Sequence, residues 1–102
     1  MVILKLQVGK EISPSTATKC GVSLDGFILK SGNVRVSYYN IPLCEGWADV
    51  RFFMPINYDI VHVRTLKGKE CPAWWGDTRW YGLRLRKGDR IIGWKFISRR
   101  ED

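Results

Sequence analysis

The chain has 102 residues, of which 45% are hydrophobic and 13% aromatic, and its formal net charge is +7. This length supports one hydrophobic core, so we expect a single all-β domain over residues 1–102. The apolar content excludes a disordered chain, and no apolar run reaches the roughly 20 residues that cross a bilayer. Three widely spaced cysteines and a start without a secretory signal pattern predict a reduced, cytoplasmic protein.

Positive charge is concentrated in the last two-fifths of the chain. Residues 1–61 hold six Lys and Arg against five Asp and Glu, a net charge of +1, whereas residues 62–102 hold eleven against five, a net charge of +6. The same stretch contains four of the five tryptophans, which are Trp74, Trp75, Trp80 and Trp94. Large aromatic area beside uncompensated positive charge indicates a binding surface for an anionic partner.

Alternating apolar and polar residues predict strands along most of the chain. The first strand covers residues 2–8, with its even-numbered residues on one face, and it ends at Gly9. The polar run from Ser13 to Thr16 is expected to form a loop with room for a short helical turn.

A hairpin is expected between residues 22 and 41, with a two-residue turn at Ser31-Gly32. This turn pairs residues whose numbers sum to 63, which places Leu29 opposite Val34. A turn one position further along would place two like charges opposite each other, which is unfavourable. The first register is therefore predicted.

Two further strands are expected at residues 50–56 and 60–66. In the first, the even-numbered residues share one face, and Pro55 indicates that this strand ends there or lies at a sheet edge. After the second strand, residues 67–78 are expected to form loops. Two adjacent tryptophans in a loop cannot both face one core.

The last hairpin has the clearest pattern, with a turn at Gly88-Asp89 that has glycine in the position that a type II′ turn prefers. This turn pairs residues whose numbers sum to 177, which places Leu83 opposite Trp94 between two further apolar pairs. Those pairs are expected to face the core. The predicted outward face carries Trp80, Gly82, Arg84, Arg86, Ile91, Gly93, Lys95 and Ile97.

About seven mostly antiparallel strands without repeats or linkers predict an all-β fold, either a single small β-sandwich or a partly open barrel. The pattern does not decide between the two, because the Cys and Trp spacing of an immunoglobulin domain is absent. The tail from Arg99 to Asp102 is expected to fray.

Catalytic groups are sparse, and we therefore predict that the protein is not an enzyme. General acid-base and nucleophilic catalysis need cooperating groups, but His62 is the only histidine. Its place on an expected strand favours a structural role over a catalytic one. A zinc site would have to combine His62 with Cys20, Cys44 and Cys71, which lack the close cysteine pair of structural zinc sites. We expect no metal and no cofactor.

The predicted outward face of the last hairpin is the candidate binding site. Arginine forks match phosphate, a tryptophan offers a stacking platform for a base, and Gly82 and Gly93 would let a ligand approach the sheet closely. The alternative is an ordinary solvated face on which arginine stems cover apolar side chains. The candidate ligand-binding residues are Trp74, Trp75, Arg79, Trp80, Arg84, Arg86, Arg90 and Lys95.

The first functional hypothesis is binding of a nucleic acid or nucleotide, with Arg99 and Arg100 as further phosphate contacts. The second is a protein-interaction module that binds an acidic partner, such as a small inhibitor, a virus-encoded antagonist or an assembly subunit. Self-association through Trp80, Ile91 and Ile97 belongs to this hypothesis. Carbohydrate binding ranks third, because the aromatic region holds few acceptors for sugar hydroxyls.

Overall fold

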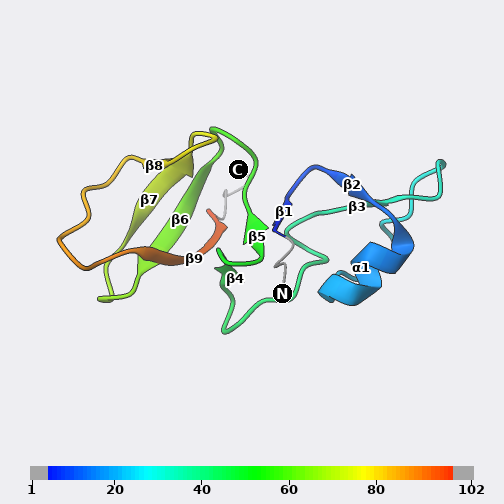
Figure 1. Cartoon of the computed structure of the whole chain (residues 1–102), viewed down its shortest axis with the longest axis horizontal. Coiled ribbons are helices and arrows are strands. Elements are labelled where there is room, and N and C mark those ends of the chain that lie inside the picture. Colours follow the sequence, from blue (N-terminus) through cyan, green and yellow to red (C-terminus); the bar gives the residue numbers. More distant parts are fainter. Residues whose placement is uncertain (1–4, 98–102) are drawn as a thin grey trace, which may run out of the picture.

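The structure, a computed structural model, describes residues 5–97 and is all-β with one short helix. Its elements are β1 (Leu6–Gln7), β2 (Glu11–Ile12), α1 (Pro14–Cys20), β3 (Val34–Arg35), β4 (Ala48–Asp49), β5 (Phe53–Met54), β6 (Ile60–Thr65), β7 (Glu70–Trp75), β8 (Trp80–Tyr81) and β9 (Ile91–Phe96). Figure 1 shows β6 to β9 at one end of the molecule and α1 with β2 and β3 at the other. The expected all-β class is confirmed.

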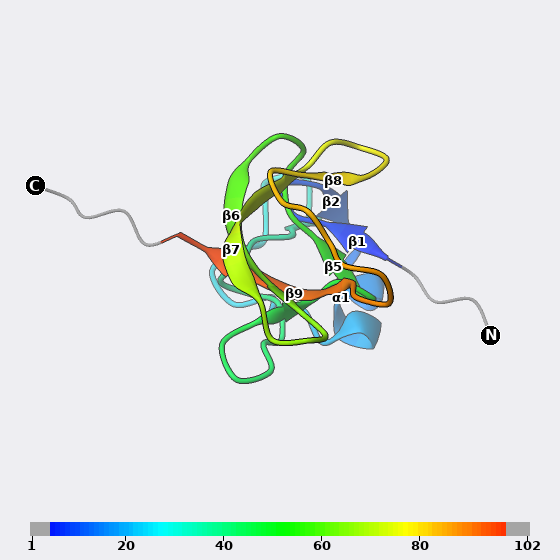
Figure 2. The same cartoon turned by 90° about the vertical axis from the view of Figure 1, so that its left-hand side faces the viewer.

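The largest sheet has five strands in the order β4-β9-β6-β7-β8, and all neighbouring strands in it are antiparallel. The other two sheets have two strands each: β1 and β5 are parallel, and β2 and β3 are antiparallel. Figure 2 looks along the molecule from the end of the large sheet, with β6 and β7 in front. Whether this arrangement is best described as a sandwich or a barrel stays a prediction, as does the single domain.

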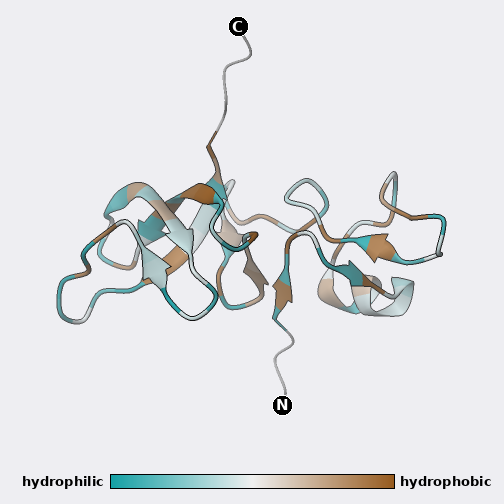
Figure 3. Ribbon diagram, turned by 90° about the horizontal axis from the view of Figure 1, so that it is seen from above, coloured by the Kyte–Doolittle hydropathy of each residue, from teal (hydrophilic) through white to brown (hydrophobic). Residues whose placement is uncertain are grey.

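The hydrophobic core is one cluster that includes residues from all three sheets. Trp94 on β9 is fully buried and donates a 3.0 Å hydrogen bond from its indole Nε1 to the carbonyl oxygen of Phe53 on β5. This bond satisfies the polar atom of a buried ring and links the large sheet to the β1-β5 pair. Figure 3 shows apolar residues at both ends of the molecule, the end with β6 to β9 and the end with β2 and β3.

The alternation expected in residues 60–66 is confirmed by β6, where Val61, Val63 and Thr65 are buried and His62 and Arg64 lie on the other face. The pairing of β6 with β9 contains an irregularity after Arg64. Such a bulge adds one residue to one strand and changes which side chains face inward. It allows β9 to bury both Ile91 and Trp94, which are three positions apart.

The segment around Ser13 was expected to be a loop with room for a short helical turn, and in the structure it forms the seven-residue helix α1. The Ser13 side chain accepts a hydrogen bond from the backbone N–H of Thr16. Pro14 is well suited to the first helical position, because a backbone N–H there would have no partner within the helix. Gly21 ends the helix with φ 76°, a conformation that glycine adopts without steric cost. Within the described part of the chain, no helix is long and apolar enough to cross a membrane.

The expected pairing of the first hairpin is wrong by one residue. Ile28 lies opposite Val34, and the backbone N–H of Leu29 bonds to the carbonyl of Asn33, so paired numbers sum to 62. The connection has three residues instead of two, with Gly32 at φ 89°. Three-residue hairpin loops commonly place a glycine in this conformation.

The expected pairing of the last hairpin is also wrong. Strand β9 pairs with β4 and β6, while β8 is only two residues long and pairs with β7. Residues 82–90 form a loop, and its turn is closed by a hydrogen bond from Asp89 N–H to the carbonyl of Arg86. Of the expected apolar pairs, Leu83 and Trp94 do pack in the core cluster, whereas Leu85 is 42% exposed.

Two further expectations are corrected. Residues 50–56 do not form one alternating strand: Phe53 and Met54 are both buried in β5, and Phe52 is exposed. Trp74 and Trp75 belong to β7 and not to a loop. Leu6 and Val8 are both buried, as expected for even-numbered residues on one face of the first strand. Val2 and Leu4 lie outside the described residues.

Candidate anion-binding site

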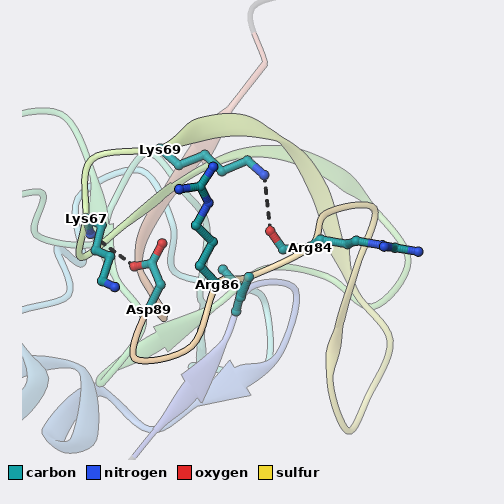
Figure 4. Close-up of a pocket in the computed structure, with 6 residues that line it drawn as sticks. Lys67, Lys69, Arg84, Arg86 and Asp89 are labelled. Carbon is teal, nitrogen blue, oxygen red and sulfur yellow. Dashed lines mark hydrogen bonds between the residues drawn. The ribbon is translucent and has the colours of Figure 1, made fainter.

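An open pocket of about 630 Å³ lies between the turn at residues 66–69, which we call the lysine turn, and residues 82–90, which we call the basic loop. Its lining is four cations, one carboxylate and one leucine, which gives a net charge of +3. We call it the basic pocket, and its residues are Lys67, Lys69, Arg84, Leu85, Arg86 and Asp89 (Figure 4). In Figure 3, the end of the molecule formed by the basic loop has mainly hydrophilic colours.

The lysine turn is fixed by Thr65, the last residue of β6. The Thr65 backbone N–H donates to the carbonyl of Lys69, and the Lys69 N–H donates to the Thr65 hydroxyl oxygen at 3.0 Å. Thr65 is 2% exposed, so this hydroxyl is held in the protein interior. Gly68 has φ 93°, which permits the tight reversal into β7.

Both lysines of the turn bind backbone carbonyls of the basic loop. Lys69 Nζ donates to the carbonyl of Arg84 at 3.1 Å, and Lys67 Nζ donates to the carbonyl of Lys87 at 3.0 Å. These bonds fix the loop against the turn. Because a carbonyl oxygen is uncharged, they orient the two ammonium groups without neutralising them.

Asp89 is the one carboxylate of the pocket, and it closes the loop. Its Oδ1 accepts hydrogen bonds from the backbone N–H groups of Lys67 at 3.0 Å and Arg90 at 2.9 Å. Partial desolvation raises the pKa of the Asp89 carboxyl, but hydrogen bonds from Lys67, Thr65 and Arg90 together with the Lys67 charge outweigh it, so the net pKa is below the ordinary value. The carboxylate is therefore engaged in holding the loop.

The two arginines of the pocket differ in direction. In Figure 4 the Arg86 side chain reaches toward Lys69, while the Arg84 guanidinium points away from both. Among the described residues, neither arginine takes part in a salt bridge, nor do Lys67 and Lys69. The pocket thus presents four cations whose charge is opposed only by Asp89.

The predicted tryptophans lie on β7 and β8, and each of them contacts another aromatic ring of the protein. Trp74 stacks on Tyr81 with ring centroids 6.0 Å apart, and Trp75 meets Trp80 edge to face at 5.5 Å. Arg79 lies 4.6 Å from the centroid of the Tyr81 ring. All three tryptophans are half-buried, and each already packs against another aromatic ring.

Lys95 and Arg90 lie away from the basic pocket. Lys95 is opposite His62 on the outward face of the large sheet, with its Nζ 4.5 Å from the centroid of Trp47. Arg90 follows Asp89 and lines a different pocket, described below. The structure therefore assembles only Arg84 and Arg86 of the eight predicted site residues in the basic pocket; Arg99 and Arg100 lie outside the described residues.

The two glycines that were expected to admit a ligand are occupied by the protein itself. A Cβ on Gly93 would lie 3.2 Å from the Cβ of Trp47 and 3.4 Å from Nε of Arg64. A Cβ on Gly82 would lie 2.8 Å from the Trp74 ring. Both positions therefore make room for tryptophan packing, which corrects the expectation. The expected self-association face is not assembled either, since Ile91 is buried and Trp80 packs against the core.

His62 lies on β6 with its Nε2 3.4 Å from Oε1 of Glu70 and its ring 5.7 Å from that of Trp47. The three cysteines are free thiols. Within residues 5–97, no three His, Cys, Asp or Glu side chains come together as a metal site.

Sequence reasoning missed four of the six pocket residues: Leu85, which was expected to face the core, and three charged residues. Lys67 and Lys69 lie in a segment that was expected only to form loops, and Asp89 was expected only as a turn residue. The Gly88-Asp89 pair gave a signal for the turn, but the bonds to the lysine turn depend on the position of β6 beside β9. No local pattern shows that contact.

Comparison with known proteins gives no relative: no family model, no curated protein and no solved structure matches the chain.

Proposed function

We propose that this protein binds nucleic acid through phosphate groups, without catalysis, and that the basic pocket is the contact site. The observation that carries the proposal is the set of four cations around a single carboxylate that is itself bonded to the loop. Holding like charges together is unfavourable in the absence of an anion. A phosphate group entering the pocket relieves that repulsion.

The chemistry of the lining suits phosphate. Arg86 supplies a planar fork of N–H donors for two oxygens of one phosphate, and Lys67 and Lys69 add charge nearby. Residues 62–102 carry a net charge of +6, so the surrounding field also attracts a polyanion. Contacts of this kind depend on the backbone of the nucleic acid and not on its bases.

The packing of the tryptophan rings also favours contacts to the nucleic acid backbone over contacts to its bases. Trp74, Trp75 and Trp80 pack against other aromatic rings, so stacking on bases has no prepared platform there. We therefore propose binding that is independent of base sequence and dominated by the release of counterions. The predicted base-stacking role of these tryptophans is not part of this proposal.

A fluorescence titration with single-stranded oligonucleotides at about 50 and about 200 mM salt tests the proposal. We expect binding at the lower salt concentration that weakens at the higher one, and a mononucleotide competes poorly because it offers fewer phosphates. Arg86→Gln should weaken binding more than Arg84→Gln, since the Arg86 side chain reaches toward Lys69 while the Arg84 guanidinium points away from both. No binding at low salt, or binding without salt dependence, contradicts the proposal.

A second candidate function is binding of an acidic protein, and one observation favours it. Leu85 lines the basic pocket and is 42% exposed, and an apolar contact within a ring of charge is common in protein interfaces. Affinity capture from cells with and without nuclease distinguishes the two candidates. Partners lost on nuclease treatment support nucleic acid binding, whereas a partner that stays bound and is lost with Leu85→Ser supports the protein interface.

A further inference from the structure

A second basic pocket, of about 470 Å³, lies at the edge of the large sheet beside β4 and the start of β9. We call it the edge pocket. Its lining includes four cations, which are Lys5, Arg51, Arg64 and Arg90, and one carboxylate, Asp49. The proposed function does not use this pocket, so its charge requires a separate account.

One of the four cations is already neutralised. Arg51 Nη2 lies 2.8 Å from Oδ2 of Asp49, and its Nε is 3.2 Å from both oxygens of the same carboxylate. The pairing lowers the pKa of Asp49, against a smaller opposing effect of burial. Arg51 and Asp49 therefore cancel, and Lys5, Arg64 and Arg90 remain as the net charge of the pocket.

Arg64 is held in place without a strong polar partner. Its guanidinium carbon lies 5.2 Å from the centroid of Trp47, and its Nη1 is 3.9 Å from Oε2 of Glu45, longer than a hydrogen bond. Its Nε is buried and has no acceptor among the described residues. The buried Nε is out of reach of a ligand, so an anion in the pocket would meet the terminal nitrogens of this guanidinium, whose side chain is 30% exposed.

The edge pocket and the basic pocket adjoin along the chain. Asp89 lines the basic pocket and the next residue, Arg90, lines the edge pocket, while the Arg90 carbonyl accepts a 2.8 Å hydrogen bond from Leu66 N–H. Arg64 and Lys67 are three residues apart, so their backbones are at most about 11 Å apart. A few nucleotides of one strand cover such a distance.

We propose that the edge pocket is a second phosphate subsite, so that one nucleic acid strand runs from the basic pocket past Asp89 to Arg90 and Arg64. This inference rests on the proposed function and adds a length requirement to it. A short oligonucleotide fills only the basic pocket. A longer one reaches both pockets and gains affinity and salt dependence from the additional contacts.

Titrations with oligothymidylates of about 4 and about 16 nucleotides test the inference, since these lengths bracket known single-strand site sizes. The variants are Arg90→Gln and Arg64→Gln, with Lys30→Gln as a control for loss of one charge. Lys30 is exposed on the turn before β3, a strand at the opposite end of Figure 1 from β7. Arg90→Gln is decisive if Arg64→Gln disturbs the packing on Trp47.

We expect Arg90→Gln to weaken the longer oligonucleotide about tenfold and to reduce its salt slope by about 0.7, with the shorter one and the Lys30→Gln variant almost unchanged. Unchanged affinity of Arg90→Gln for the longer strand overturns the second subsite alone. An equal loss for both lengths also overturns it, because Arg90 would then belong to the basic pocket. If the wild-type protein binds neither length, the proposed function itself fails.

Discussion

The carbonyl oxygen of Arg84 accepts a 3.1 Å hydrogen bond from Nζ of Lys69, which joins the basic loop to the lysine turn. A second lysine makes the equivalent bond from Lys67 to the carbonyl of Lys87. Residues that supply the charge of the pocket therefore also hold its shape. Loss of either lysine should affect loop order as well as ligand affinity.

Lys69→Met removes the charge and the donor while keeping an unbranched apolar side chain. We expect the global stability to fall by only about 0.5–1 kcal/mol, because the bond is exposed to solvent. Amide hydrogen exchange in residues 82–88 should become faster, since the loop loses one of its tethers. Lys10→Met, at an exposed site on the other side of the fold, is the control. Unchanged exchange in the loop would show that the bond does not hold it.

Asp89→Asn tests the carboxylate that closes the loop. The folded-state pKa of Asp89 is below its ordinary value because the net effect of its hydrogen bonds and the Lys67 charge outweighs desolvation. Its ionised form therefore stabilises the fold above the ordinary carboxyl pKa of about 3.9, and this contribution is lost as pH falls through the lower folded pKa. Thermal unfolding should show a wild-type advantage at pH 6 to 7 that shrinks below about pH 4. A constant difference across that range would rule out this role.

Gly76 provides a test of how the aromatic residues of β7 and β8 are packed. A Cβ at this position would collide with the Tyr81 ring, which stacks on Trp74. Gly76→Ala should therefore cost about 1–3 kcal/mol in urea unfolding. In a Tyr81→Ala background the same change should cost much less, because the ring is gone. Equal costs in both backgrounds would mean that the collision is not what constrains Gly76.

Local patterns in the sequence were enough to predict the all-β class and some of the strands. The alternation in residues 60–66 predicts the strand that forms as β6, because this signal depends only on neighbouring residues. The neighbours of β9 were not predictable in the same way. Matching apolar residues favoured the segment just before β9 in the sequence as its partner strand. In the structure the partner is β6, and the pairing of β6 with β9 includes a bulge.

For the candidate site, charge was predictable and geometry was not. Arg84 and Arg86 were placed on the outward face of a last hairpin that does not form, in a basic part of the chain, and both line the pocket. The predicted face also included Lys95, which instead lies over Trp47 from a distant part of the chain. Gly93 was interpreted as space for a ligand because the sequence cannot show that Trp47 fills it.

The central claim is that the basic pocket binds nucleic acid through its arginines, and charge reversal tests it most directly. Salt-dependent titration of a single-stranded oligonucleotide should be compared for the wild-type protein, Arg84→Glu with Arg86→Glu, and a control with the same charge change, Lys10→Glu with Lys30→Glu. All four positions are exposed, so both variants should keep the wild-type fold by circular dichroism. We expect the arginine variant to lose binding and the control to retain most of it. Equal weakening of both variants would contradict a localised site, and full binding by the arginine variant would exclude the basic pocket.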